Sequence, residues 1–90
     1  MKKRKHFVFY GDVQGVGFRW KACQLAKQYD LTGWVRNEYD GTVTMEAQGE
    51  NMALFVMISR LKEDRWIRVD HMDVEEIPLT DNERSFGPLN

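Results

Sequence analysis

The chain has 90 residues, of which 42% are hydrophobic and 12% are aromatic, so we expect one small domain with a single core. Its formal net charge of −1 argues against a protein that binds mainly nucleic acid, because such proteins usually carry a strong basic excess. One cysteine excludes a disulfide within the chain, and with only two histidines beside it the sequence has no cluster with metal-ligand spacing. We therefore expect no metal, no nucleic-acid partner and a partly buried Cys23 without a chemical role.

The charged N-terminus resembles the start of a signal peptide. Its apolar run, residues 7–10, ends at Gly11 and is shorter than the roughly 7 to 15 residues of a hydrophobic signal region. No other segment is apolar for long enough to cross a membrane. The sequence predicts a cytoplasmic monomer with no membrane partner, in which the four cations at positions 2–5 form a solvated arm.

The first half of the chain predicts a strand, a helix and a second strand. Residues 6–10 are β-branched or aromatic and are followed by Gly11, which indicates a buried strand. A helix begins at Phe18, because apolar side chains then recur with the spacing of one helix face: Phe18, Ala22, Leu25, Ala26 and Tyr29. Residues 31–36 predict a second strand. The dipeptide Asp40-Gly41 that follows favours a type I′ hairpin turn.

The second half predicts two more strands and a helix. Residues 43–48 alternate between apolar and polar, which is typical of a half-buried strand. Residues 51–62 are apolar nearly all round and predict a well-buried helix capped by Glu50 or Asn51. Residues 67–77 alternate in two phases, as a strand with a bulge or kink would. The tail, residues 78–90, offers only a short edge strand around Phe86.

The order βαββαβ is that of a ferredoxin-like α+β fold, an antiparallel sheet with two helices on one face. The first two strands are joined by a crossover helix and must therefore run parallel to each other. Their C-terminal ends then lie at one edge of the sheet. If the third strand lies between them, the loop over residues 11–17 and Asn37 face each other across about 10 Å, which is two strand spacings.

The stretch "GDVQGVGFRW" has the composition of an anion-binding loop. Successive main-chain N–H groups in a glycine-containing turn that leads into a helix form a concavity for anions. Gly15 and Gly17 permit such a turn, and Arg19 can direct a planar fork of donors at the same anion. The stretch has neither the lysine of a Walker loop nor the third glycine of the dinucleotide fingerprint, so we do not expect a nucleotide.

The segments "GDVQGVGFR" and "LTGWVRNEYDGTVTMEAQG" resemble the two signature segments of the acylphosphatase family, in order and in spacing. The resemblance implies a ferredoxin-like fold and hydrolysis of carboxyl–phosphate anhydrides without metal or cofactor, with inorganic phosphate as product and inhibitor. It implies that Arg19 is the catalytic, phosphate-binding arginine and that Asn37 positions the attacking water. The loop that supplies main-chain donors to the substrate would consist of Gln14, Gly15, Val16, Gly17 and Phe18.

Two departures from the family pattern concern structure. Asp30 stands at the end of the first helix, where the family usually has glycine, so it must adopt a left-handed conformation at a cost of about 1 kcal/mol. The C-terminal segment "RSFGPLN" resembles the family's last edge strand only weakly.

Three other kinds of domain have the same order of elements or the same loop. An RNA-recognition module shares this order of elements, but residues 43–48 contain none of the stacking aromatics that it needs. A non-catalytic phosphate- or anion-binding accessory domain of the same fold is the main alternative, since fold does not guarantee activity. A further variant is the related domain found fused in carbamoyl-transferring maturation proteins.

Overall fold

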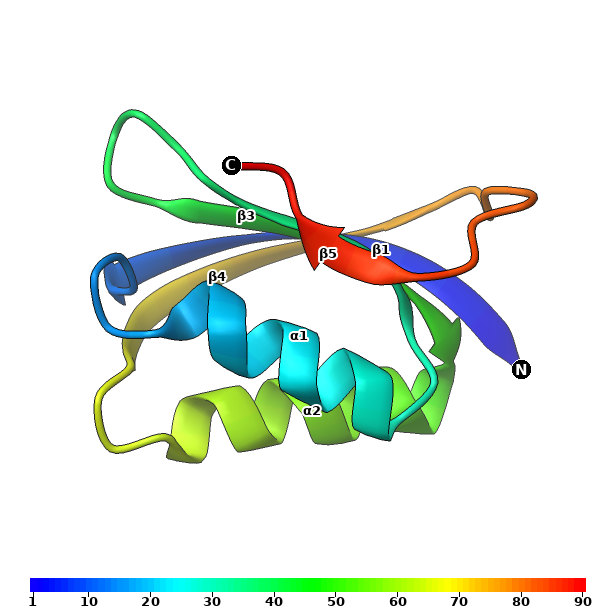
Figure 1. Cartoon of the computed structure of the whole chain (residues 1–90), viewed down its shortest axis with the longest axis horizontal. Helices are drawn as coiled ribbons and strands as arrows, with labels where there is room; N and C mark the ends of the chain where they lie inside the picture. Colours follow the sequence, from blue (N-terminus) through cyan, green and yellow to red (C-terminus); the bar gives the residue numbers. More distant parts are fainter.

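The computed structural model describes all of residues 1–90 and has two helices packed on one face of a five-stranded sheet (Figure 1). The elements in chain order are β1 (Lys2–Asp12), α1 (Phe18–Gln28), β2 (Thr32–Asn37), β3 (Val43–Glu50), α2 (Asn51–Glu63), β4 (Arg68–Ile77) and β5 (Phe86–Pro88). This confirms the predicted order and the ferredoxin-like α+β fold, with β5 as the short edge strand around Phe86. Neither helix is both long enough and apolar enough to span a bilayer.

The strand order in the sheet is β4-β1-β3-β2-β5. Strand β3 is antiparallel to both β1 and β2, so β1 and β2 point in the same direction, as predicted. Strand β5 pairs parallel to β2, with Gly33 opposite Phe86 and Val35 opposite Pro88. The loop after β1, the end of β2 and the C-terminal residues therefore gather at one edge of the molecule.

The core lies between the helices and the inner face of the sheet. Phe7 and Phe9 of β1 are 2% and 0% exposed, and the Phe9 ring lies 4.8 Å from that of Phe18, between centroids. Phe18 is the first residue of α1, so its burial fixes where the helix begins relative to the end of β1. Arg19, the next residue, is thereby turned away from the core.

The predicted solvated arm is wrong, because residues 2–5 belong to β1. The Arg4 side chain is only 3% exposed and lies on the sheet face opposite the helices. Its guanidinium donates to Glu46 at 3.1 Å and to Glu83 at 2.7 Å. Glu83 comes from the segment between β4 and β5, which the ion pair fastens over this face of the sheet.

The predicted half-burial of β3 is also wrong, because side chains on both of its faces are buried. Gln48 is 4% exposed on the face away from the helices. Its amide exchanges two hydrogen bonds with the main chain of Thr80, at 3.0 and 2.8 Å. The β4–β5 segment thus covers a surface that the alternating pattern had assigned to solvent.

Helix α2 begins one residue after Glu50, as predicted, but it is not well buried. Leu54, Met57 and Leu61 pack into the core, whereas Met52 and Phe55 are 72% and 68% exposed. The helix lies in the outer layer and touches the protein along one face only (Figure 1), so its other apolar residues face solvent.

Three local predictions had different outcomes. The turn after β2 is closed by a hydrogen bond of 3.2 Å from the Gly41 N–H to the Glu38 carbonyl. Asp40 does not take a positive φ, which a type I′ turn requires, so that prediction is wrong. The bulge is confirmed at Asp70, which has no partner between the pairs at His71 and Val69. Asp30 has φ 57°, the predicted left-handed conformation.

Candidate active site

The loop after β1 leads directly into the N-terminus of α1. Gly15 and Gly17 have φ values of 72° and 81°, which glycine adopts without strain. Gly17 is the residue that precedes the helix, and no side chain caps the first turn, which also contains no acidic residue. Among the turns and loops, no main-chain N–H from Gln14 to Phe18 donates to another main-chain oxygen. The loop therefore presents unpaired donors at the positive end of a helix.

Arg19 lies in the first turn of α1 beside this loop. It forms no ion pair with an aspartate or glutamate side chain, whereas Arg4, Arg36 and Arg68 each do. Its guanidinium is therefore not paired with an acidic side chain, and an arginine at a helix N-terminus can direct charge-assisted hydrogen bonds at an anion. Positive charge is thus concentrated at one point of the loop.

Asn37 is the last residue of β2 and pairs with Val43 of β3. It lines the same cavity as Arg19, a space of about 440 Å³ whose walls include Gly15, Gly17 and Phe18. Its side-chain amide forms no hydrogen bond within the protein; only its main-chain N–H and carbonyl do. The topology therefore brings together the two residues that the sequence singled out, as the strand order predicted.

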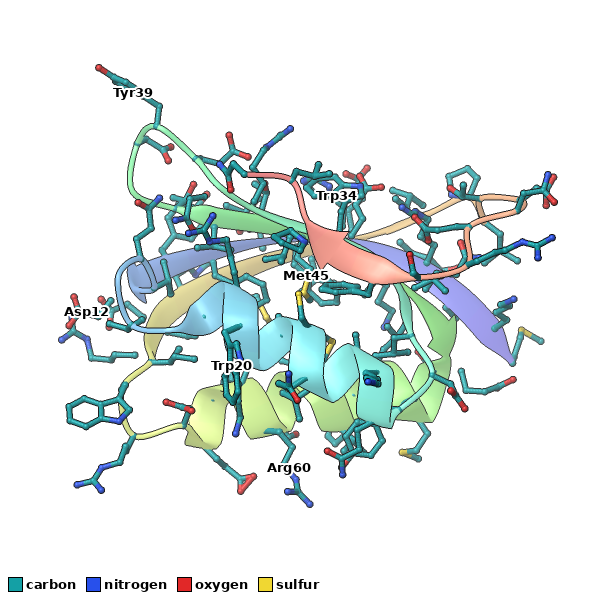
Figure 2. The ribbon with its side chains drawn as sticks, in the orientation of Figure 1. Asp12, Trp20, Trp34, Tyr39, Met45 and Arg60 are labelled. Atoms are coloured by element: carbon teal, nitrogen blue, oxygen red, sulfur yellow. The ribbon has the colours of Figure 1, made fainter.

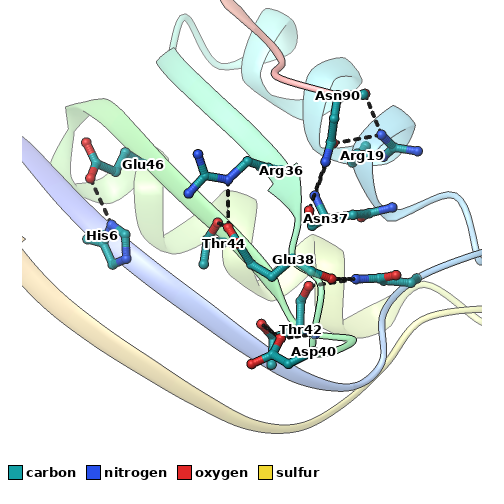
Figure 3. Close-up of polar contacts among 11 residues, drawn as sticks. His6, Arg19, Arg36, Asn37, Glu38, Asp40, Thr42, Thr44, Glu46 and Asn90 are labelled. Carbon is teal, nitrogen blue, oxygen red and sulfur yellow. Dashed lines mark hydrogen bonds and ion pairs between the residues drawn. The ribbon is translucent and has the colours of Figure 1, made fainter.

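Asn90 joins Arg19 to Asn37 (Figure 3). The Arg19 guanidinium donates to the main-chain oxygen of Asn90 and, at 2.9 Å, to its Oδ1. The same Oδ1 accepts from the Asn37 N–H at 3.2 Å, and the Asn90 Nδ2 donates to the Asn37 carbonyl at 2.8 Å. Sequence reasoning missed this residue. The only available signal was the predicted edge strand, which on pairing with β2 carries the following residues toward Asn37.

A family model of acylphosphatase matches residues 5–88. The chain belongs to the acylphosphatase family. An acylphosphatase of Bifidobacterium longum is 43% identical over 86 residues, which are 93% of this chain and 89% of the relative. The crystal structure of the Bacillus subtilis acylphosphatase has a TM-score of 0.90 and 30% identity, with both chains fully covered. The structure of an acylphosphatase from Coxiella burnetii has a TM-score of 0.88 and 32% identity, over 97% of this chain and 92% of the other.

Membership in the family gives the activity, which is hydrolysis of acyl phosphates to a carboxylate and inorganic phosphate. The chain is accordingly an enzyme, a hydrolase of acid anhydrides, and the comparisons do not favour the accessory-domain alternative. The fold that the acylphosphatase resemblance implied is also the one observed. The comparisons do not assign roles to individual residues, so these depend on the geometry of the cavity.

Gln14 and Val16 do not line the cavity, unlike Gly15, Gly17 and Phe18. The Gln14 side chain points instead to the hairpin after β2, where its Nε2 donates to the carbonyls of Glu38 and Thr42 at 2.7 and 2.9 Å. These two bonds hold the loop against the turn that follows Asn37. Val16 is half-buried and packs against the core, so the side chains of both residues anchor the loop.

The cavity walls contain no histidine, aspartate or glutamate. Burial is the main cause that raises the pKa of the Cys23 thiol, although the nearby Arg19 charge opposes it; the thiol is therefore neutral. On the adjoining hairpin, hydrogen bonds from Thr44 and Arg36 lower the pKa of Glu38, and hydrogen bonds from Thr42 lower that of Asp40. No group in the cavity is suited to general acid or base catalysis near neutral pH.

Proposed function

We propose that acyl phosphate hydrolysis takes place in the cavity between the loop and Asn37, without metal or cofactor. Arg19 and the loop N–H groups would bind the phosphoryl group, and Asn37 would orient the attacking water. The observation that carries this proposal is that Arg19 and Asn37 line one cavity and share one hydrogen-bonding partner, the Oδ1 atom of Asn90.

The leaving group explains why a cavity without acid or base groups suffices. An acyl phosphate releases a carboxylate, which is stable as an anion near neutral pH and needs no proton from the enzyme. The P–O bond to the acyl group breaks with both electrons going to the carboxylate, and the water oxygen forms the new bond to phosphorus. The absence of histidine and carboxylate from the walls is compatible with this reaction.

Stabilisation of the phosphoryl oxygens is then the main requirement. In a loose transition state negative charge is spread over three equatorial oxygens. The Arg19 guanidinium still has donors available at Nε and Nη2, because only Nη1 donates to Asn90. Together with the unpaired N–H groups of the loop, these donors would form a preorganised cradle for that charge.

Asn37 supplies an oxygen that can accept a hydrogen bond from water. Its side-chain amide is free of protein partners, and it lies across the cavity from the loop. An amide cannot remove a proton, so Asn37 would act through orientation alone. The proton of the attacking water would pass to an oxygen of the transferred phosphate.

Two further properties belong to the same proposal. Inorganic phosphate would inhibit competitively, because it carries the phosphoryl oxygens that the cradle binds. The enzyme would act as a monomer in the cytoplasm, and its single free cysteine is compatible with a reducing compartment.

The test is the hydrolysis of benzoyl phosphate in EDTA by the wild type and by Arg19→Ala and Asn37→Ala, with p-nitrophenyl phosphate as the control substrate. Arg36→Ala is a matched control, since Arg36 precedes Asn37 on β2 but pairs with Glu38 at 2.7 Å, outside the cavity.

We expect Arg19→Ala to lose both turnover and inhibition by phosphate. Asn37→Ala should lower kcat by about 100-fold, within the range for one positioned polar group, with little change in the phosphate Ki. Retained phosphate inhibition in Arg19→Ala, or wild-type activity that EDTA abolishes and a divalent metal restores, would contradict the proposal.

A further inference from the structure

The cavity has more space than a phosphoryl group requires. It measures about 440 Å³, whereas the four oxygens of a phosphate need roughly 100 Å³ at about 30 Å³ for each water-sized group. The polar part of the walls consists of Gly15, Gly17, Arg19, Asn37 and Asn90. The remaining volume adjoins that part and is where the acyl group of a bound substrate must lie.

The walls around this remaining volume are apolar. Val13 and Phe18 are 1% and 2% exposed and form its floor, while Trp20 and Pro88 stand at the rim. Cys23 adds a thiol that burial keeps neutral. Arg19 is the only charged residue in the whole lining, and the phosphoryl group would engage it. Nothing is left to neutralise a second charge on the substrate.

Trp20 is the tryptophan without an aromatic or cationic neighbour. Trp34 lies beneath the Arg36 guanidinium and against His6, and Trp66 lies beneath that of Arg65. Trp20 is 67% exposed and directly follows Arg19. Figure 2 shows its side chain on the outer surface of α1, near the N-terminal end of the helix and clear of the core. No aromatic ring or cation of the protein therefore stacks on its indole.

We propose that Trp20 and Pro88 form an acyl subsite that selects apolar, planar acyl groups over charged ones. This inference rests on the proposed function, since it needs the phosphoryl group at Arg19. An indole at the rim offers an aromatic acyl group an offset or edge-to-face contact, and Pro88 offers an apolar surface on the β5 side of the cavity. A carboxylate on the acyl group would be desolvated there without a cation to compensate, which would weaken binding.

The experiment compares kcat/KM for benzoyl phosphate, acetyl phosphate and succinyl phosphate, the last of which has a charged acyl group. The variants are Trp20→Ala, Trp20→Phe and Trp66→Ala. Trp66 is a matched control because it is 68% exposed and does not line the cavity. The phosphate Ki of each variant reports on the phosphoryl site independently.

We expect Trp20→Ala to lower the ratio of benzoyl to acetyl phosphate about fivefold to tenfold, the size of a lost aromatic contact, with the phosphate Ki unchanged. Trp20→Phe should restore most of the ratio, Trp66→Ala should leave it unchanged, and the wild type should prefer benzoyl to succinyl phosphate. An unchanged ratio in Trp20→Ala, or equal use of succinyl phosphate by the wild type, overturns the subsite. Failure of the folded wild type on all three substrates instead overturns the proposed function, and the subsite with it.

Discussion

Replacing Asn90 with alanine tests whether this residue positions Arg19 for its substrate. The substitution removes the bond of 2.9 Å from Arg19 to Oδ1 and both bonds to the Asn37 main chain, but it keeps the main-chain oxygen that also accepts from Arg19. Fixing an arginine side chain costs about 1.5 to 2 kcal/mol of rotamer entropy. The variant loses one of the two oxygens that hold the Arg19 side chain in place. About 1 kcal/mol of the entropy cost must then be met when the substrate binds, which corresponds to an affinity about fivefold weaker.

The assay is the Ki of inorganic phosphate against benzoyl phosphate hydrolysis, measured for the wild type and Asn90→Ala. Leu89→Ala serves as a control, because Leu89 is 55% exposed and contacts Val35 through its main-chain N–H, which the substitution keeps. We expect Ki to rise about fivefold in Asn90→Ala and to stay unchanged in Leu89→Ala. A Ki that falls in Asn90→Ala would refute the reasoning, since it would mean that the Asn90 oxygens compete with phosphate for Arg19.

Two further predictions concern stability. Gly11→Ala should lower the free energy of unfolding by more than about 2 kcal/mol, because φ is 130° and a Cβ would collide with the main-chain oxygen of Arg68. Gly15→Ala should cost only about 1 kcal/mol, since Gly15 has φ 72° and a Cβ there would meet open space. Urea unfolding of both variants checks this, and equal losses would contradict it. Hydrogen bonds from Thr42 hold the pKa of Asp40 below its ordinary value of 3.8, so this carboxylate contributes stability above about pH 4 that is lost as the pH falls through the folded-state pKa. The stability difference between the wild type and Asp40→Asn should therefore shrink below about pH 4 in unfolding curves measured at several pH values, and a difference that grows toward acid would argue against it.

Local periodicity was enough to predict the elements of this fold. Phe18, Ala22 and Leu25 lie on one face of α1. Their helical spacing, directly after Gly17, indicates a helix that begins at Phe18. The bulge in β4 was also visible in the sequence, because the apolar positions change phase along residues 67–77. The unpaired Asp70 produces this shift of one residue. Both features have causes that lie within a few residues, whereas the type of the turn at Asp40 was predicted wrongly although it too is local.

Two of the wrong predictions concern contacts between residues that are distant in sequence. Arg4 is buried because Glu83, 79 positions later, returns across the outer face of the sheet. Gln48 is buried by Thr80 in the same segment. Alternation states which side chains share a face of a strand, but it does not state what covers that face. The burial of both residues depends on the path of the β4–β5 segment, and this segment has little periodicity of its own.

The residues of the candidate site also differ in whether the sequence could predict them. The loop and Arg19 are contiguous in sequence, and Asn37 follows from the strand order, so all of these could be predicted. Asn90 could not, because its place depends on the register of a three-residue edge strand, β5.

Two amide side chains connect the three segments of the site by hydrogen bonding to main-chain groups. Gln14 ties the loop to the carbonyls of Glu38 and Thr42, and Asn90 ties the C-terminal segment to the main chain of Asn37. These amides do not titrate, and they contribute no charge to the cavity. Arg19 consequently remains the only residue of the lining with a charged side chain. The proposed mechanism would need one cation and an oriented water, and the side chains that hold the loop and the C-terminal segment to the end of β2 are neutral amides.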